Sequence, residues 1–156
     1  MKRLGIAAGL LAAVAFGGVA VAAEPPGTVS VTIIDQAATH VGSIVNPCTG
    51  QTVTVLAAGR SVEHLTYFSN SDEFWYTFTA TADVSFTDGT VSYAGHDTFW
   101  VGANGNERND NFTLTDNGTL LGTDGSRVGV HERAHIAFNA VGIATVWFDV
   151  IDATCR

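Results

Sequence analysis

The chain has 156 residues, two cysteines and a formal net charge of −8. Its only lysine, Lys2, and Arg3 precede an apolar N-terminal run, and the chain beyond that run carries five arginines against fifteen acidic residues, a net charge of −10. A protein this acidic repels phosphate backbones and anionic lipid surfaces, which argues against nucleic acid and membrane partners and leaves a small molecule or another protein.

The N-terminal segment has the pattern of a secretory signal peptide. Lys2 and Arg3 come before the apolar run, and small residues lead to Pro25 and Pro26. We therefore expect cleavage after Ala22 or Ala23, removing residues 1–23, and a secreted, extracellular protein. A transmembrane anchor is the alternative, because the run approaches spanning length. Residues 24–29 are expected to be a flexible leader, and residues 30–156 a single domain.

Two segments rich in β-branched residues, 29–37 and 51–59, are the first predicted strands, separated by the turn-like "NPCTG" at 46–50. Residues 72–86 then alternate strictly. Even positions carry Phe, Tyr, Ala or Val from Phe74 to Phe86, while the odd positions are mainly threonine and acids. This period of two predicts a long strand with one face in a core.

Turn residues divide the remaining chain. "DGT" at 88–90 predicts a turn before a returning strand over 91–102, and 104–111 is a polar loop. Asn117-Gly118 predicts a hairpin between 112–115 and 119–122, and "DGS" at 124–126 a further turn. The last predicted pair is the strand around residues 128–140 and the strand 143–155, joined by "NAVG".

No segment of helical length shows an apolar stripe, so the prediction is an all-β antiparallel domain of about seven to nine strands. Long strands that bend through glycine favour a single closed β-barrel, lipocalin-like or similar, because closure removes exposed edges. A β-sandwich is the alternative. Cys48 and Cys155 are predicted to form one disulfide that ties the last strand to the start of the domain. A free thiol pair or an intermolecular bridge remains open.

The segment His131-Glu132-Arg133-Ala134-His135 matches the HExxH pattern of zinc peptidases. That motif requires a helix, which brings its two histidines to one ion. Here, however, the even positions from Val128 to Ala140 are apolar except Glu132, which predicts a strand. The histidine Cα atoms would then lie roughly 13 Å apart, with Glu132 on the opposite face. We therefore predict no metal site formed by this motif and no zinc peptidase.

The same alternation lines up His131, Arg133 and His135, and the next strand offers Trp147 and Asp149 if the odd faces pair. Three interpretations remain: a polar outer surface, a ligand-binding lining of a barrel or cleft, or a metal held between strands with His64 or His96. The sequence contains no nucleophile-elbow, phosphate-loop or dinucleotide motif, so no cofactor and no catalytic residue is predicted. The three tryptophans, Trp75, Trp100 and Trp147, are candidates for stacking on sugars or for burial in the sheet.

Four stretches, "NPCTGQTV", "NERND", "DGSRVGVHERAHIAFNAVG" and the terminal "TCR", resemble a group of small, uncharacterised secreted proteins of actinobacteria. The likeness covers residues 46–156. It implies export, a β fold and paired cysteines at 48 and 155, and it brings no catalytic residue. "NAVG" departs from the tighter Asn-Gly turn of the group, which leaves the geometry of that hairpin open.

The function expected from these observations is a secreted β-barrel that binds a small apolar or amphipathic molecule or another protein. An enzyme of cyclase or isomerase type, using His131, Arg133 and His135, is the first alternative. A structural or assembly protein of the cell envelope is the second. The face that these three residues occupy separates the enzyme from the other two, because catalysis requires an enclosed pocket around them.

Overall fold

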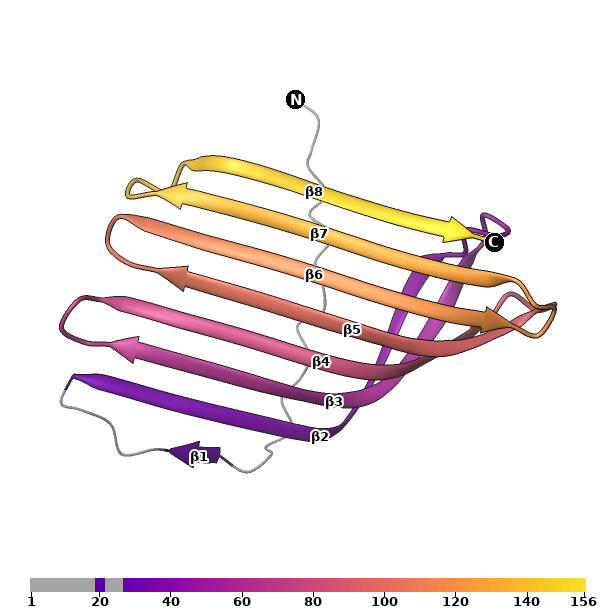
Figure 1. Ribbon diagram of the computed structural model, residues 1–156, viewed down its shortest axis with the longest axis horizontal. Coiled ribbons are helices and arrows are strands. Elements are labelled where there is room, and N and C mark those ends of the chain that lie inside the picture. The colour runs from indigo at the N-terminus through magenta and orange to yellow at the C-terminus, as the bar shows by residue number, and fades with distance from the viewer. Residues whose placement is uncertain (1–18, 22–26) are drawn as a thin grey trace.

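The computed structural model describes residues 19–21 and 27–156, which form one antiparallel sheet (Figure 1). Its strands lie side by side in chain order, so the predicted all-β antiparallel class is confirmed. The eight strands are β1 Val19–Val21, β2 Thr28–Val45, β3 Thr52–Phe68, β4 Glu73–Thr87, β5 Ser92–Gly105, β6 Asn109–Gly122, β7 Arg127–Asn139 and β8 Ala144–Cys155. The short β1 falls inside the predicted signal peptide, and the rest of residues 1–26 lies outside the described residues.

Four of the predicted turns are confirmed. Each contains a glycine with positive φ, a conformation that a residue with a Cβ rarely adopts. They are Gly50 in "NPCTG" (φ 74°), Gly89 in "DGT" (92°), Gly125 in "DGS" (88°) and Gly142 in "NAVG" (73°). The glycines in the sequence therefore predicted the positions of these turns correctly.

The predicted hairpin at Asn117-Gly118 is wrong. β6 continues through this dipeptide and pairs without interruption with both β5 and β7. Asn117 Oδ1 lies 2.6 Å from His131 Nδ1 on the neighbouring strand, and Gly118 leaves room for the carboxylate of Asp97. Two ladders of hydrogen bonds thus outweigh the local preference of an Asn-Gly pair for a turn. The polar loop predicted at 104–111 shortens to 106–108.

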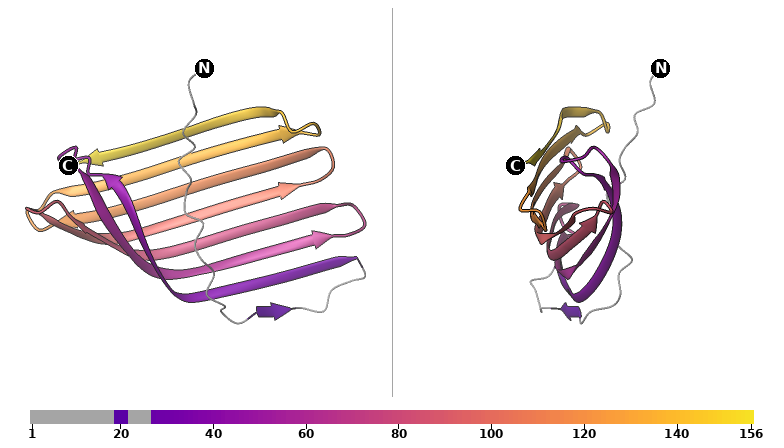
Figure 2. Two further views of the ribbon diagram at one scale, coloured as in Figure 1. Left: turned by 180° about the vertical axis from the view of Figure 1, so that it is seen from behind. Right: turned by 90° about the vertical axis from the view of Figure 1, so that its right-hand side faces the viewer.

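The sheet is rolled at one end only. Over most of their length β2–β8 form one curved layer, but the second half of β2 and the first half of β3 bend across it and reach the end of β8 (Figures 1 and 2). The register shift in β2 between Asp35 and residue 38 lies within this region. Cys48, in the β2–β3 turn, forms the predicted disulfide with Cys155 at the end of β8, with 5.0 Å between their Cα atoms. We call this the closed end, and the opposite end, with the turns around residues 69–72, 106–108 and 140–143, the open end.

The hydrophobic core lies at the closed end, between the β2–β3 arm and strands β4–β7. Phe86 and Tyr93 stack there with ring centroids 4.6 Å apart. The buried members of the core are Val53, Val55, Val84, Phe86, Tyr93, Leu120 and Val128. We call the face of the sheet that carries them the inner face. The even positions of β4 point to it and the odd positions from Trp75 to Ser85 are exposed, as the sequence predicted.

The sheet does not close, so the predicted barrel is not confirmed. Among the described strands, β8 pairs with β7 alone. After β1 there are seven strands, an odd number, which makes β2 and β8 run in the same direction. An antiparallel ladder between these two edges is therefore impossible, and towards the open end no other described strand lies over the inner face (Figure 2).

Candidate ligand-binding face

The HExxH segment lies in strand β7, as predicted, and its register separates the motif residues. His131 lies opposite Asp152 and His135 opposite Phe148, while Glu132 lies opposite Ile151 on the other face. His135 Nδ1 lies 2.8 Å from Thr113 Oγ1, and its ring packs on Phe148. Among the described residues, no group of three or more His, Cys, Asp or Glu side chains is placed to hold a metal ion.

The predicted patch of five residues is split between the two faces of the sheet. His131, Arg133 and His135 lie on the outer face, opposite Asp152, Val150 and Phe148. Trp147 and Asp149 lie on the inner face, opposite Ile136 and Ala134. The sequence could not decide this, because moving the register of a hairpin by one residue exchanges the faces of a whole strand.

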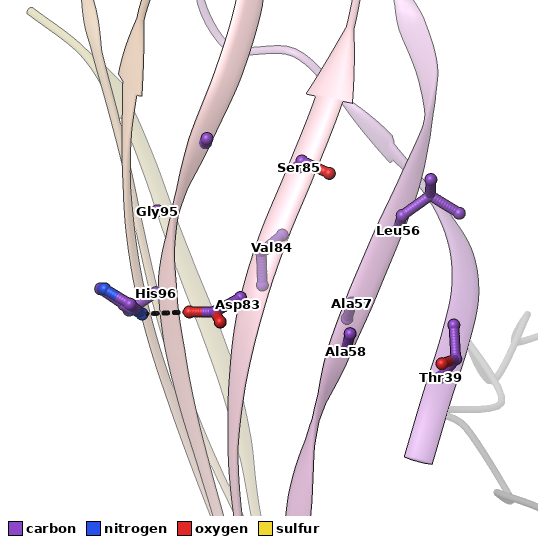
Figure 3. Close-up of a pocket in the computed structure, with 10 residues that line it drawn as sticks. Thr39, Leu56, Ala57, Ala58, Asp83, Val84, Ser85, Gly95 and His96 are labelled. Atoms are coloured by element: carbon purple, nitrogen blue, oxygen red, sulfur yellow. Dashed lines mark ion pairs between the residues drawn. The ribbon is translucent and has the colours of Figure 1, made fainter. Parts of the chain in front are cut away.

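The row His131, Arg133 and His135 faces solvent. His131 and Arg133 are exposed and His135 is half-buried. The outer face does have two shallow hollows near the closed end, of about 600 and 670 Å³, but neither includes a residue of the row. Figure 3 shows the first hollow, where His96 Nδ1 lies 2.7 Å from Asp83 Oδ1 on the adjacent strand. Placing the row on the outer face removes the basis on which the enzyme alternative was predicted.

The inner face carries a different group of polar residues, one carboxylate on each of four neighbouring strands. Asp116 on β6 lies directly opposite Glu132 on β7. Asp97 on β5 lies opposite Gly118, two residues nearer the closed end than Asp116. Asp149 on β8 lies opposite Ala134, two residues nearer the open end than Glu132. Directly paired residues of an antiparallel ladder share a face, so all four point to the same side. We call Asp97, Asp116, Glu132 and Asp149 the acidic row.

The acidic row holds negative charge in a partly desolvated place. Burial, a side-chain hydrogen bond with Asp97 and the negative charges of Asp97 and Glu132 raise the pKa of Asp116 to about 7. Burial and the charge of Asp149 raise the pKa of Glu132. A hydrogen bond between two carboxyl groups needs a proton on one of them, so near neutral pH the Asp97–Asp116 pair holds this proton part of the time. Asp116 Oδ1 is buried and has no hydrogen-bond partner.

Aromatic and aliphatic side chains surround the acidic row on its open-end side. Phe78 on β4 and Phe99 on β5 meet edge to face, with ring centroids 5.9 Å apart. Trp147 on β8 is 61% exposed. The pairing register adds Phe74, Tyr76, Val101, Phe112, Leu114, Ile136 and Phe138 to the same face. Among the described residues no layer covers them, so neighbours within the sheet bury Val101 and half-bury the others. We call them, with Phe78, Phe99 and Trp147, the apolar patch.

The sequence contained a signal for the acidic row. Each acid takes a position in its strand where the alternation would place an apolar residue. Asp116 falls between Leu114 and Leu120, and Asp149 between Trp147 and Ile151. Glu132 was recognised as such an exception in β7 and Asp149 as a candidate patch residue, whereas Asp97 and Asp116 were not singled out. An acid at an inward position on each of four strands predicts a polar row inside the fold.

Comparisons of this chain with known protein families, curated proteins and solved structures found no match. The resemblance to small secreted actinobacterial proteins therefore stays a prediction. In the described part of the chain, no helix has the length and apolar character that crossing a membrane requires.

The candidate site is the open inner face, where the acidic row lies beside the apolar patch.

Proposed function

We propose that this protein is an extracellular binding module that takes a small amphipathic cation on its inner face. The observation that carries this proposal is the acidic row directly beside the uncovered apolar patch. A ligand with an apolar body and a positively charged group matches both parts at once. The sequence predicted ligand binding inside a barrel. We retain ligand binding in this proposal but assign it to the open inner face of the sheet.

Charge decides which amphipath fits. Negatively charged neighbours in the acidic row raise the pKa of Asp116 and of Glu132, and in the described residues no arginine is paired with the row in the ladder. A cation placed among them relieves this repulsion, and its positive charge can lie close to Asp116 Oδ1, a buried oxygen without a hydrogen-bond partner. An anionic amphipath, or the same face of a second copy, would instead add negative charge. A neutral apolar ligand would leave the carboxylates uncompensated.

Calorimetric titration with dodecyltrimethylammonium below its critical micelle concentration tests the proposal, with dodecyl sulfate as the anionic counterpart. We expect saturable binding of the cation and none of the anion. Asp149→Asn should weaken binding about two- to fivefold, the effect of losing one exposed ion pair. Asp152→Asn removes the same charge from the outer face of the same strand and should leave the affinity unchanged. Equal binding of both detergents, or equal effects of the two variants, contradicts the proposal.

The pH dependence provides a second readout. Because the pKa of Asp116 is raised to about 7, this carboxyl gains its negative charge between pH 6 and 8. A bound cation favours the ionised form, so binding should tighten over this range and release protons. Asp116→Asn should remove most of this dependence. Affinity that weakens as the pH rises from 6 to 8 would contradict the role of Asp116.

A further inference from the structure

The outer face of β4, β5 and β6 has a tryptophan at the centre of an uncharged polar surface. Trp100 on β5 lies between Thr79 on β4 and Thr115 on β6. Two residues further along β5, Gly102 lies between Thr77 and Thr113. This surface is on the opposite side of the sheet from the acidic row, so it is independent of the function proposed above.

Trp100 lies along its own strand and covers Gly102. A Cβ at Gly102 would overlap Cη2 of the indole and lie 2.7 Å from Cζ2, so the glycine leaves the space that the six-membered ring fills. The end of the six-membered ring therefore lies over Gly102 of its own strand. The side chain remains 39% exposed. Trp100 is thus an indole ring held in place along its own strand and partly open to solvent.

A second exposed tryptophan lies on the same face. Trp75 on β4 is 56% exposed, and its Nε1 donates a hydrogen bond of 2.7 Å to Glu73 Oε1. It pairs with Asn104, whose side-chain oxygen accepts a hydrogen bond of 3.1 Å from Asn111 Nδ2. Trp75 lies one strand across and four residues along from Trp100. At ordinary strand spacings their Cα atoms are therefore roughly 14 Å apart. Threonine hydroxyls and asparagine amides occupy the positions between and beside the two rings.

We propose that Trp75 and Trp100, with the threonine and asparagine side chains between them, bind an uncharged oligosaccharide of at least three sugar units. The C–H face of a pyranose is apolar and packs on an aromatic ring, while its equatorial hydroxyls project outward in the plane of the sugar. Thr79, Thr113 and Thr115 each offer a hydroxyl that both donates and accepts, and Asn104 and Asn111 offer amides. The surface around Trp100 carries no carboxylate, and Arg133 and His135 lie at its β7 side. Because the positions directly beside Trp100 are uncharged, this surface suits a neutral chain of hydroxyl groups.

The test uses the full chain without its predicted signal peptide, titrated separately with cellohexaose, xylohexaose and chitohexaose. Tryptophan fluorescence and calorimetry are the readouts. We expect saturable binding of at least one hexasaccharide. Trp100→Ala should weaken it at least tenfold, and Trp100→Phe, which keeps a smaller ring, should weaken it less. Trp75→Ala should weaken the hexasaccharide more than the corresponding disaccharide, because only the longer ligand spans both rings.

Trp147→Ala is the matched control, since it removes an exposed tryptophan from the inner face. It should leave the saccharide affinity unchanged and weaken the binding of dodecyltrimethylammonium. Far-UV circular dichroism establishes that each variant is folded, and Trp100→Phe keeps the test informative if Trp100→Ala does not fold. The proposal is overturned if none of the three hexasaccharides binds, or if Trp100→Phe and Trp75→Ala bind as tightly as the parent. Equal losses in Trp147→Ala and the Trp100 variants would overturn it as well.

Discussion

Asp116 is the residue whose surroundings depart most from those of a surface carboxylate. It is half-buried, lies opposite Glu132 and shares a hydrogen bond with Asp97. Its pKa of about 7 lies well above the value of about 3.9 expected in an unfolded chain. Between these two values the folded protein holds a proton that the unfolded protein releases. The free energy of unfolding should therefore fall as the pH rises from about 4 to about 7.

Asp116→Asn tests this linkage, because asparagine does not titrate. The variant should be more stable than the parent at pH 8 by about 1 kcal/mol, well below what a fully buried group with this pKa would give, since water screens a half-exposed carboxyl. At pH 4, where the parent holds its proton, the difference should disappear. Urea denaturation at both pH values measures it, with Asp152→Asn as the exposed control. A variant that loses stability in parallel with the parent between pH 4 and 7 would show that Asp116 titrates normally.

At the scale of single strands, the curvature of the closed end depends on glycines that face inward. Gly95 on β5 lies opposite Leu120 on β6 and Val84 on β4. A Cβ at Gly95 would overlap the carbonyl oxygen of Thr119 and lie 2.7 Å from the Cα of Leu120. Both are backbone atoms, so no change of rotamer relieves the overlap. Gly59 on β3 is in the same situation against the backbone of β4.

Gly95→Ala should therefore lower the free energy of unfolding by about 3 kcal/mol, the upper part of the range for overpacked cores. Gly129→Ala on β7 is the control. The added Cβ there meets only the side-chain oxygen of Thr154, at 3.1 Å, which can move away. That change should leave stability within about 1 kcal/mol of the parent, because alanine also suits a strand better than glycine. Denaturant unfolding followed by fluorescence compares the two, and equal losses would show that strand glycines act only through flexibility.

At the scale of the whole molecule, the disulfide joins the two edges of the sheet where the hydrogen-bonded ladder does not. Cys48 and Cys155 are 107 residues apart in sequence. Closing a loop of this length restricts the unfolded chain by about 4 to 5 kcal/mol in the chain-entropy model. In the folded state the bridge holds the β2–β3 arm over the core. The closed end is thus fixed by one covalent bond and by apolar packing.

Replacing both cysteines, Cys48→Ser with Cys155→Ser, should lower the free energy of unfolding by about 4 kcal/mol. The reduced parent should match the double variant, which separates the effect of the bond from that of the new side chains. Denaturant unfolding gives the energies. Small-angle X-ray scattering should show a larger radius of gyration if the β2–β3 arm opens. An unchanged midpoint of unfolding would mean that packing alone holds the closed end.

The sequence by itself determined where most strands and turns fall and which residues of a strand share a face, because these follow from period-two alternation and from glycine at positive φ. The pairing of the two cysteines followed from their number. The tertiary structure decided what depends on register and curvature: Asn117-Gly118 lies inside β6, Trp147 and Asp149 lie across the sheet from His131, Arg133 and His135, and the sheet stays open. Register decides which faces of neighbouring strands combine, and contacts between residues far apart in sequence fix it. For that reason the acidic row and the Trp100 surface emerge only when the strands are assembled.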